Sequence, residues 1–366
     1  MAKAIVFKKV VGQTRIRKLL CSAAARDSLG HAYLFAGDNG VGKFATALEL
    51  AMGLLCVSTD NAPCYTCESC RRVLQNAHGD FRVVMPLALR KEHRNSSKEL
   101  NEDGWNFCAD SVRSRITDPY LPLSHEGNAT IPVEWIKEVN QQILRGAAQN
   151  GYAVTILCDI DTFNKESANA LLKTLEEPPP QSLLLLLTSR PQAVLPTILS
   201  RCQLVRFGTL PEDTIATALA GRLACSPDDE RVKQAVAYSR GSLGRAAQLS
   251  DTELPQVLEQ ARAFLAVCTA GNWRAITEMV DRISLAADPL LYEQFFNSLA
   301  FVVRGTILLP DKASQTYINS SLSNPERAGL LLNICQNALY ALQAHGVPAL
   351  VLAHCAASLM ECMQNE

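Results

Sequence analysis

The amino-acid sequence predicts an α/β P-loop fold with a parallel sheet, followed by two helical domains. A glycine-rich loop stands between an apolar run and a helical pattern, and further apolar runs alternate with amphipathic helices up to residue 208. Beyond Leu210 the strand signals vanish. Because strands that alternate with helices form parallel sheets, we predict a sheet domain over residues 1–208, a small helical lid over 209–252 and an all-helical domain over 253–366.

Composition and charge exclude several classes of protein. The 366 residues suffice for two or three domains. The charge of 35 lysines and arginines is nearly balanced by 36 aspartates and glutamates. A chain that binds nucleic acid over its whole surface would be strongly basic, which this one is not. It has no apolar run of about 18 residues and no signal-peptide core, so we expect a cytoplasmic protein without membrane contact.

The first elements lead to the glycine-rich loop. Ile16, Leu19, Leu20 and Ala23 fall on one helical face, and an apolar strand is predicted over residues 32–36. A helix that reaches about residue 55 is predicted after the loop.

The loop itself, residues 37–44, has the spacing of a phosphate-binding P-loop. Gly37, Gly40 and Gly42 allow backbone N–H groups to turn toward an anion, and Lys43 is placed to reach the phosphates. The last position is Phe44, where a P-loop ATPase has the serine or threonine whose hydroxyl binds Mg²⁺. The loop can therefore form, but one metal ligand is missing.

Four cysteines within fifteen residues predict a zinc module at about residues 56–72. They are Cys56, Cys64, Cys67 and Cys70. Zinc takes four ligands in a tetrahedron, and Cys-x-x-Cys turns bring two sulfurs onto one ion. Because four sulfurs leave no open coordination position, we expect a structural site and not a catalytic one.

A polar insertion over residues 87–130 follows a predicted strand at 81–85, with a short helix near residues 104–116. Its basic residues Arg90, Lys91, Arg94 and Lys98 suggest two interpretations, a nucleic-acid contact or a solvated loop. We favour the solvated loop, since charge runs usually form a solvated face.

The second half of the predicted sheet carries acidic residues at a strand end. A helix begins near residue 131, and strands are predicted over 153–158, 182–188 and 203–207. Asp159 and Asp161 come at the carboxyl end of the first of these strands, where open parallel sheets place their site residues. P-loop ATPases hold the Mg²⁺ shell with an aspartate at this place.

Several motifs resemble one family, the AAA+ clamp-loader subunits of bacterial replicative DNA polymerase. They are Val11-Gly12-Gln13, the segment 31–35, the P-loop, the four cysteines, the segment from Asn169 to Pro179, Ser200-Arg201-Cys202 and Gly241-Ser242. Together they span residues 11 to about 247, and the two segments that end in Pro179 and Cys202 are the most specific. The resemblance implies an AAA+ fold, and the helical C-terminal domain would be the family's oligomerisation collar.

The family contains ATP-hydrolysing motor subunits and a non-hydrolysing partner, and the departures favour the partner. Aligned on Asn169, the metal-shell aspartate of the motor subunits falls on Cys158 and their water-activating glutamate on Asp159. The arginine that motor subunits carry in the lid falls on Gly244, although Arg245 follows directly. With Phe44, two Mg²⁺ ligands are absent.

The resemblance also implies a role for Arg201 in a neighbouring subunit. In the family the arginine of the Ser-Arg-Cys segment acts as an arginine finger toward the neighbour's ATP. The expected partners are motor subunits, a clamp-opening subunit and, through the complex, the sliding clamp and primer-template DNA. We thus expect a component of the DNA polymerase III holoenzyme without a small-molecule substrate of its own.

Two alternatives remain at this point. The first alternative to the non-hydrolysing subunit is an ATP-hydrolysing motor subunit of the same family. The second, from another class, is a zinc-dependent DNA-binding module. Near-zero net charge and a closed four-cysteine site argue against the second. The residues leave open whether the P-loop still binds nucleotide.

Overall fold

The computed structural model describes residues 3–364 except 96–98, 122–128, 145, 148–150, 164, 252–253, 285–291, 293–294, 301, 304–324 and 344–345. The chain forms two compact units, Met1–Gln248 and Leu249–Glu366. The finer boundaries at residues 208 and 252 stay a prediction. Among the described residues, no helix combines the length and the apolar character needed to cross a membrane.

The first unit contains a five-stranded sheet in the order β2-β3-β4-β1-β5, with every pair parallel. The strands are β1 (Ala32–Ala36), β2 (Phe81–Val84), β3 (Ala153–Leu157), β4 (Ser182–Thr188) and β5 (Gln203–Arg206). The central β4 is buried at every position, because its run of leucines packs against layers on both sides. The predicted parallel sheet is confirmed.

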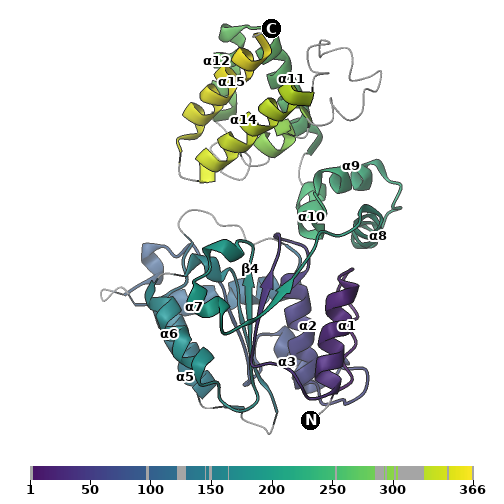
Figure 1. Ribbon diagram of the computed structural model, residues 1–366, viewed down its shortest axis with the longest axis vertical. Coiled ribbons are helices and arrows are strands. Elements are labelled where there is room, and N and C mark those ends of the chain that lie inside the picture. The colour runs from purple at the N-terminus through teal and green to yellow at the C-terminus, as the bar shows by residue number, and fades with distance from the viewer. Residues whose placement is uncertain are drawn as a thin grey trace. The chain divides into compact units, whose positions relative to one another are not determined.

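Helices cover both faces of this sheet (Figure 1). On one face lie α1 (Thr14–Ala25), α2 (Lys43–Leu55) and α3 (Glu68–Leu74), and on the other α5 (Val133–Leu144), α6 (Lys165–Glu176) and α7 (Pro196–Leu199). The first unit is therefore an α/β domain built on a parallel sheet, as the sequence predicted. Parallel strands end at a common edge, so the loops after β1, β3 and β4 meet there.

The helix predicted in the insertion is confirmed. Helix α4 spans Glu102–Thr117 and buries Cys108, Val112 and Ile116, and Tyr120 just beyond it is also buried. This i, i+4, i+8 apolar stripe packs the helix against the domain. The solvated-loop interpretation of the basic residues before α4 stays a prediction. Arg90 and Lys91 are exposed, and Lys98 lies outside the described residues.

Three helices follow the sheet and are termed the lid, and the last of them begins against the P-loop. They are α8 (Glu212–Leu223), α9 (Glu230–Tyr238) and α10 (Leu243–Asp251). The Ser242 hydroxyl donates a hydrogen bond to the Asn39 carbonyl at 2.7 Å, and the Gly244 N–H donates to the Gly40 carbonyl at 3.1 Å. The start of α10 therefore closes over the loop.

Apart from the connections at residues 270–272 and 346–347, the described residues of the second unit are helical. Its helices include α11 (Leu254–Thr269), α12 (Trp273–Ser284), α14 (Pro325–Gln343) and α15 (Pro348–Gln364). Phe264, Phe295 and Phe296 form its buried aromatic core, with edge-to-face ring pairs at 5.3 and 5.6 Å. Such pairs stabilise beyond their buried area.

The lid contact predicts a steric effect of Gly244→Ala. The added Cβ would lie 2.0 Å from the Tyr120 carbonyl oxygen and 2.8 Å from the Gly40 Cα, and main-chain atoms cannot rotate aside. We expect a loss of about 1–3 kcal/mol of unfolding free energy, measured by urea denaturation. Gly221→Ala on α8, where no atom lies within 4 Å, is the control and should gain up to about 1 kcal/mol. Equal stability of the two variants would contradict this packing.

Candidate functional site

The P-loop is closed on its own lysine. Gly40 and Gly42 adopt φ values of 74° and 104°, which suit glycine, and Lys43 begins α2 with 6% of its surface exposed. The Lys43 ammonium donates hydrogen bonds to the carbonyls of Gly37 and Asp38, the latter at 2.8 Å. In this closed state the loop's own carbonyl oxygens accept the hydrogen bonds that the Lys43 ammonium would otherwise donate to a phosphate.

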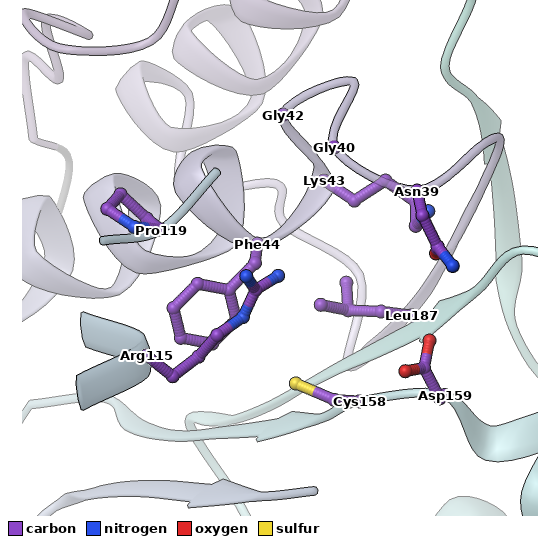
Figure 2. Close-up of a pocket in the computed structure, with 10 residues that line it drawn as sticks. All are labelled: Asn39, Gly40, Gly42, Lys43, Phe44, Arg115, Pro119, Cys158, Asp159 and Leu187. Atoms are coloured by element: carbon purple, nitrogen blue, oxygen red, sulfur yellow. The ribbon is translucent and has the colours of Figure 1, made fainter. Parts of the chain in front are cut away.

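A cavity of about 20 Å³ lies beside the loop (Figure 2). It is lined by Asn39, Gly40, Gly42, Lys43, Phe44, Arg115, Pro119, Cys158, Asp159 and Leu187. Six of these residues are the loop and metal-shell positions singled out in the sequence. Gly37 is not among the lining residues but contributes its carbonyl to Lys43.

The positions that would bind Mg²⁺ do not fit the ion. Phe44 is 1% exposed and presents a phenyl ring in place of a hydroxyl. Burial raises the pKa of the Cys158 thiol to about 12, so the group is a neutral thiol at neutral pH. Mg²⁺ prefers oxygen ligands, and neither residue offers a side-chain oxygen.

The neighbouring Asp161 has a different role. Its carboxylate accepts hydrogen bonds from the Thr188 hydroxyl at 2.6 Å and from Arg190 at 2.8 Å. The Asp161 side chain is only 2% exposed. Because Asp161 follows β3 and its partners lie at the end of β4, these bonds link the ends of the two strands. Asp161 is thus paired with Thr188 and Arg190 and is not among the residues that line the cavity.

Of the other four cavity residues, Asn39 and Leu187 lie in the predicted loop and strand, whereas Arg115 and Pro119 were missed in the sequence, together with the adjoining Tyr120. The Arg115 guanidinium, from the last turn of α4, lies 4.6 Å from the centre of the Phe44 ring, a cation–π distance. The Tyr120 hydroxyl accepts a hydrogen bond from the Val11 N–H at 2.6 Å. The apolar stripe of α4 was the available signal, because it predicts a helix packed on the domain.

The site brings two cations together. The pKa of Lys43 is lowered to about 8, chiefly by burial; Asp159 opposes this shift, and the nearby Arg115 contributes to it. Burial also lowers the pKa of Arg115, with Cys158 and Asp159 opposing that shift. Desolvation disfavours the charged forms of both groups.

Arg201 lies outside this cavity, between α7 and β5. Its guanidinium forms an ion pair with Glu176 at 2.7 Å and donates to the Thr197 carbonyl at 2.9 Å. The side chains of Arg201 and Glu176 are 35% and 51% exposed. Arg201 is accordingly a partly exposed cation that does not reach its own P-loop cavity.

The four predicted cysteines form a cluster. The sulfurs of Cys56, Cys64, Cys67 and Cys70 all lie within 4.8 Å of one another, and that of Cys56 is 3.9 Å from that of Cys67. Zinc–sulfur bonds of about 2.3 Å place tetrahedral sulfurs roughly 3.8 Å apart. The backbone N–H groups of Cys64, Cys67 and Cys70 donate to sulfurs of the cluster. The donor set fits a zinc ion.

Glu49 connects this cluster to the P-loop helix. Its buried carboxylate, on α2, accepts hydrogen bonds from the backbone N–H groups of Lys8, Lys9 and Val10. It also accepts one from the hydroxyl of Tyr65, which stands between two of the cysteines. The helix that begins at Lys43 is thereby fixed to both the N-terminal segment and the cluster.

The buried lysine predicts a pH effect that Lys43→Met should remove. The pKa of Lys43 is near 8 in the folded protein against 10.5 for an ordinary lysine, so the unfolded state binds more protons between these values. Wild-type unfolding free energy should rise with pH over this window relative to Lys43→Met, by up to about 3 kcal/mol. Urea denaturation of both proteins from pH 7 to 10 measures it. Parallel curves would contradict the shift.

Comparisons with known proteins agree with this geometry. A family model described as "DNA polymerase III, delta subunit" matches residues 12–211. The chain is 26% identical over 288 residues to "DNA polymerase III subunit delta'" of Bacillus subtilis (strain 168), covering 76% of this chain and 75% of that protein. The corresponding protein of Haemophilus influenzae is 26% identical over 240 residues, covering 65% and 60%.

The gamma/tau subunits are related over a shorter region. "DNA polymerase III subunit gamma/tau" of Mycobacterium tuberculosis (strain ATCC 25618 / H37Rv) is 32% identical over 215 residues, which is 58% of this chain and 30% of that protein. With the family match over more than half of the chain, the P-loop domain and the four-cysteine cluster, the chain belongs to the DNA polymerase III delta-prime subunit family, which is related to the gamma/tau clamp-loader subunits.

Proposed function

We propose that this clamp-loader subunit hydrolyses no ATP and supplies Arg201 as an arginine finger to the ATP site of a neighbouring motor subunit. The proposed absence of ATP hydrolysis is supported by Phe44 and Cys158, which line the P-loop cavity at the positions where a P-loop ATPase has metal ligands. Without a metal, the charge that develops on a transferred phosphoryl group is not neutralised. Lys43, already bonded to the loop, cannot replace that ion alone.

The surroundings of Arg201 support the proposed arginine-finger role. A finger that acts on another subunit must be accessible and already oriented, and Arg201 is both partly exposed and held by Glu176 and the Thr197 carbonyl. Arginine presents a planar fork that suits phosphate oxygens as well as carboxylates. An incoming phosphate can therefore take over the guanidinium from Glu176.

The family membership supports a set of partners. The chain would assemble through its C-terminal helices with gamma/tau-like motor subunits and a delta-like clamp opener. Through the complex it would act on the sliding clamp and primer-template DNA in the cytoplasm, as part of the DNA polymerase III holoenzyme.

A structural zinc ion is the cofactor that the cluster favours. Cys56, Cys64, Cys67 and Cys70 would hold it, and four thiolates leave no position for a reacting molecule. Its contribution would be to fix the segment 56–70 against α2, next to Glu49.

Replacement of Arg201 tests the finger role. The chain alone should hydrolyse no more ATP than Lys43→Ala does. In the reconstituted clamp loader, Arg201→Ala should leave assembly intact and should remove most of the turnover at the one site that this chain adjoins, since a finger supplied in trans is worth about 10³–10⁵ in GTPases. Steady-state and single-turnover ATPase rates measure it.

Arg206→Ala provides the matched control, because Arg206 is an exposed arginine on the next strand, β5. Its ATPase rates should equal those of the wild type. Unchanged turnover with Arg201→Ala would remove the finger role. Hydrolysis by the chain alone that Lys43→Ala abolishes would instead identify a motor subunit.

Removal of one cysteine tests the zinc site. Cys67→Ser should release about one zinc ion per chain and destabilise the first unit by several kcal/mol, because metal-binding free energy contributes to folding. Cys225→Ser, outside the cluster and half-buried, should retain the metal. Elemental analysis and urea denaturation provide the readouts. A wild-type protein purified without zinc would contradict the site.

A further inference from the structure

The two metal-shell positions of the P-loop both border one cation, the guanidinium of Arg115. Phe44 lies in cation–π contact with it at 4.6 Å, and Cys158 lines the same cavity. Figure 2 shows the Arg115 side chain reaching from α4 to the Phe44 ring, on the side of the cavity where Cys158 lies. A positive charge tethered to the protein thus stands beside the phosphate loop, where a P-loop ATPase holds a metal ion.

The guanidinium of Arg115 retains hydrogen-bond donors without a partner in the part of the chain that the structure describes. Its Nε and Nη1 atoms are sealed from solvent and have no hydrogen-bond partner among the described residues. Buried donors in native proteins are nearly always paired, and an unpaired one points to a ligand or a water molecule. The guanidinium is therefore prepared to donate into the cavity.

Other groups at the same place also favour an anion. Lys43 and Arg115 line the same cavity, and the Arg115 charge disfavours the charged form of Lys43. The cavity also adjoins the N-terminus of the thirteen-residue helix α2, which carries a partial positive charge. A group that accepts hydrogen bonds and carries negative charge would relieve the repulsion and pair the free donors.

We propose that the P-loop of this chain binds a phosphoryl oxyanion without a metal ion, with the Arg115 guanidinium in the role that Mg²⁺ has in P-loop ATPases. The oxyanion belongs either to a nucleoside diphosphate or to free phosphate. Lys43 and the N–H groups of the glycine loop supply the remaining contacts. This binding is independent of the finger role of Arg201.

Binding requires the closed loop to open. The cavity of about 20 Å³ has room for roughly one water molecule, which is too little for a phosphoryl group. Lys43 must leave the Gly37 and Asp38 carbonyls, and the lid must release its bonds to Asn39 and Gly40. The ligand and the closed lid therefore compete for the same loop.

Calorimetric titration of the full chain tests the proposal. ADP is titrated in excess EDTA and, separately, in millimolar Mg²⁺, and the dissociation constants should agree within about twofold. Arg115→Met should weaken binding at least tenfold, and Arg115→Lys, which keeps a cation, should weaken it less. Arg113→Met is the control, because Arg113 lies on the same helix but is exposed and pairs with Asp110 at its surface; its affinity should equal that of the wild type.

Two further readouts complete the test. Hydrogen exchange at the Gly244 amide should accelerate when ligand binds, since that amide is bonded to Gly40 only in the closed state. Titration with inorganic phosphate separates the two sources: binding of phosphate alone indicates free phosphate, and binding of ADP only indicates a nucleotide.

The proposal is overturned by binding that requires Mg²⁺, by absence of binding with both ligands, or by full affinity in Arg115→Met. If Arg115→Met does not fold, the EDTA comparison on the wild type and the Arg115→Lys variant still decide.

Discussion

Two cations buried side by side, Lys43 and Arg115, are the constraint on which the P-loop site depends. Each must be matched by groups that tolerate a positive charge in a poorly solvated place. Lys43 has the loop carbonyls, and Arg115 has the face of a phenyl ring. A divalent ion beside these charges would be repelled strongly. Phe44, Cys158 and Arg115 are thus a consistent set, in which the metal ligands are absent and a protein cation is present.

The parallel sheet explains why residues far apart in sequence share this site. The loops after β1, β3 and β4 emerge at one edge, which places Lys43, Cys158 and Thr188 near each other. The insertion then adds α4 from outside the sheet, and the lid adds Ser242 and Gly244 from beyond it. The sheet fixes the ends of the strands, and the two added segments determine how the loop is closed.

Much of this arrangement could be predicted from the sequence, where it depends on local spacing. The part that depends on tertiary packing could not. The P-loop, the strand-end aspartates and the four cysteines lie in short segments whose spacing is set by local geometry, so Phe44 and the cluster were identified from the residues themselves, whereas Cys158 was identified from the family resemblance aligned on Asn169. Arg115 was not, because no local rule links it to a loop some seventy positions earlier. Its helix was expected, yet the partner of that helix depends on tertiary packing. The burial of Lys43, and hence its lowered pKa, could not be predicted for the same reason.

The ion pair between Arg201 and Glu176 has an energetic consequence of its own. Both side chains are substantially solvated, and pairs of this kind stabilise a protein by at most about 1 kcal/mol. The Arg201 guanidinium is therefore kept in one orientation by an ion pair that costs little free energy to break. In the proposed finger role, exchange of the Glu176 carboxylate for a phosphate oxyanion would replace one charge-assisted bond with a similar one, so it would consume little of a neighbour's binding energy. Glu176 would then hold the guanidinium in place until the phosphate arrives, and the strength of this ion pair falls as ionic strength rises.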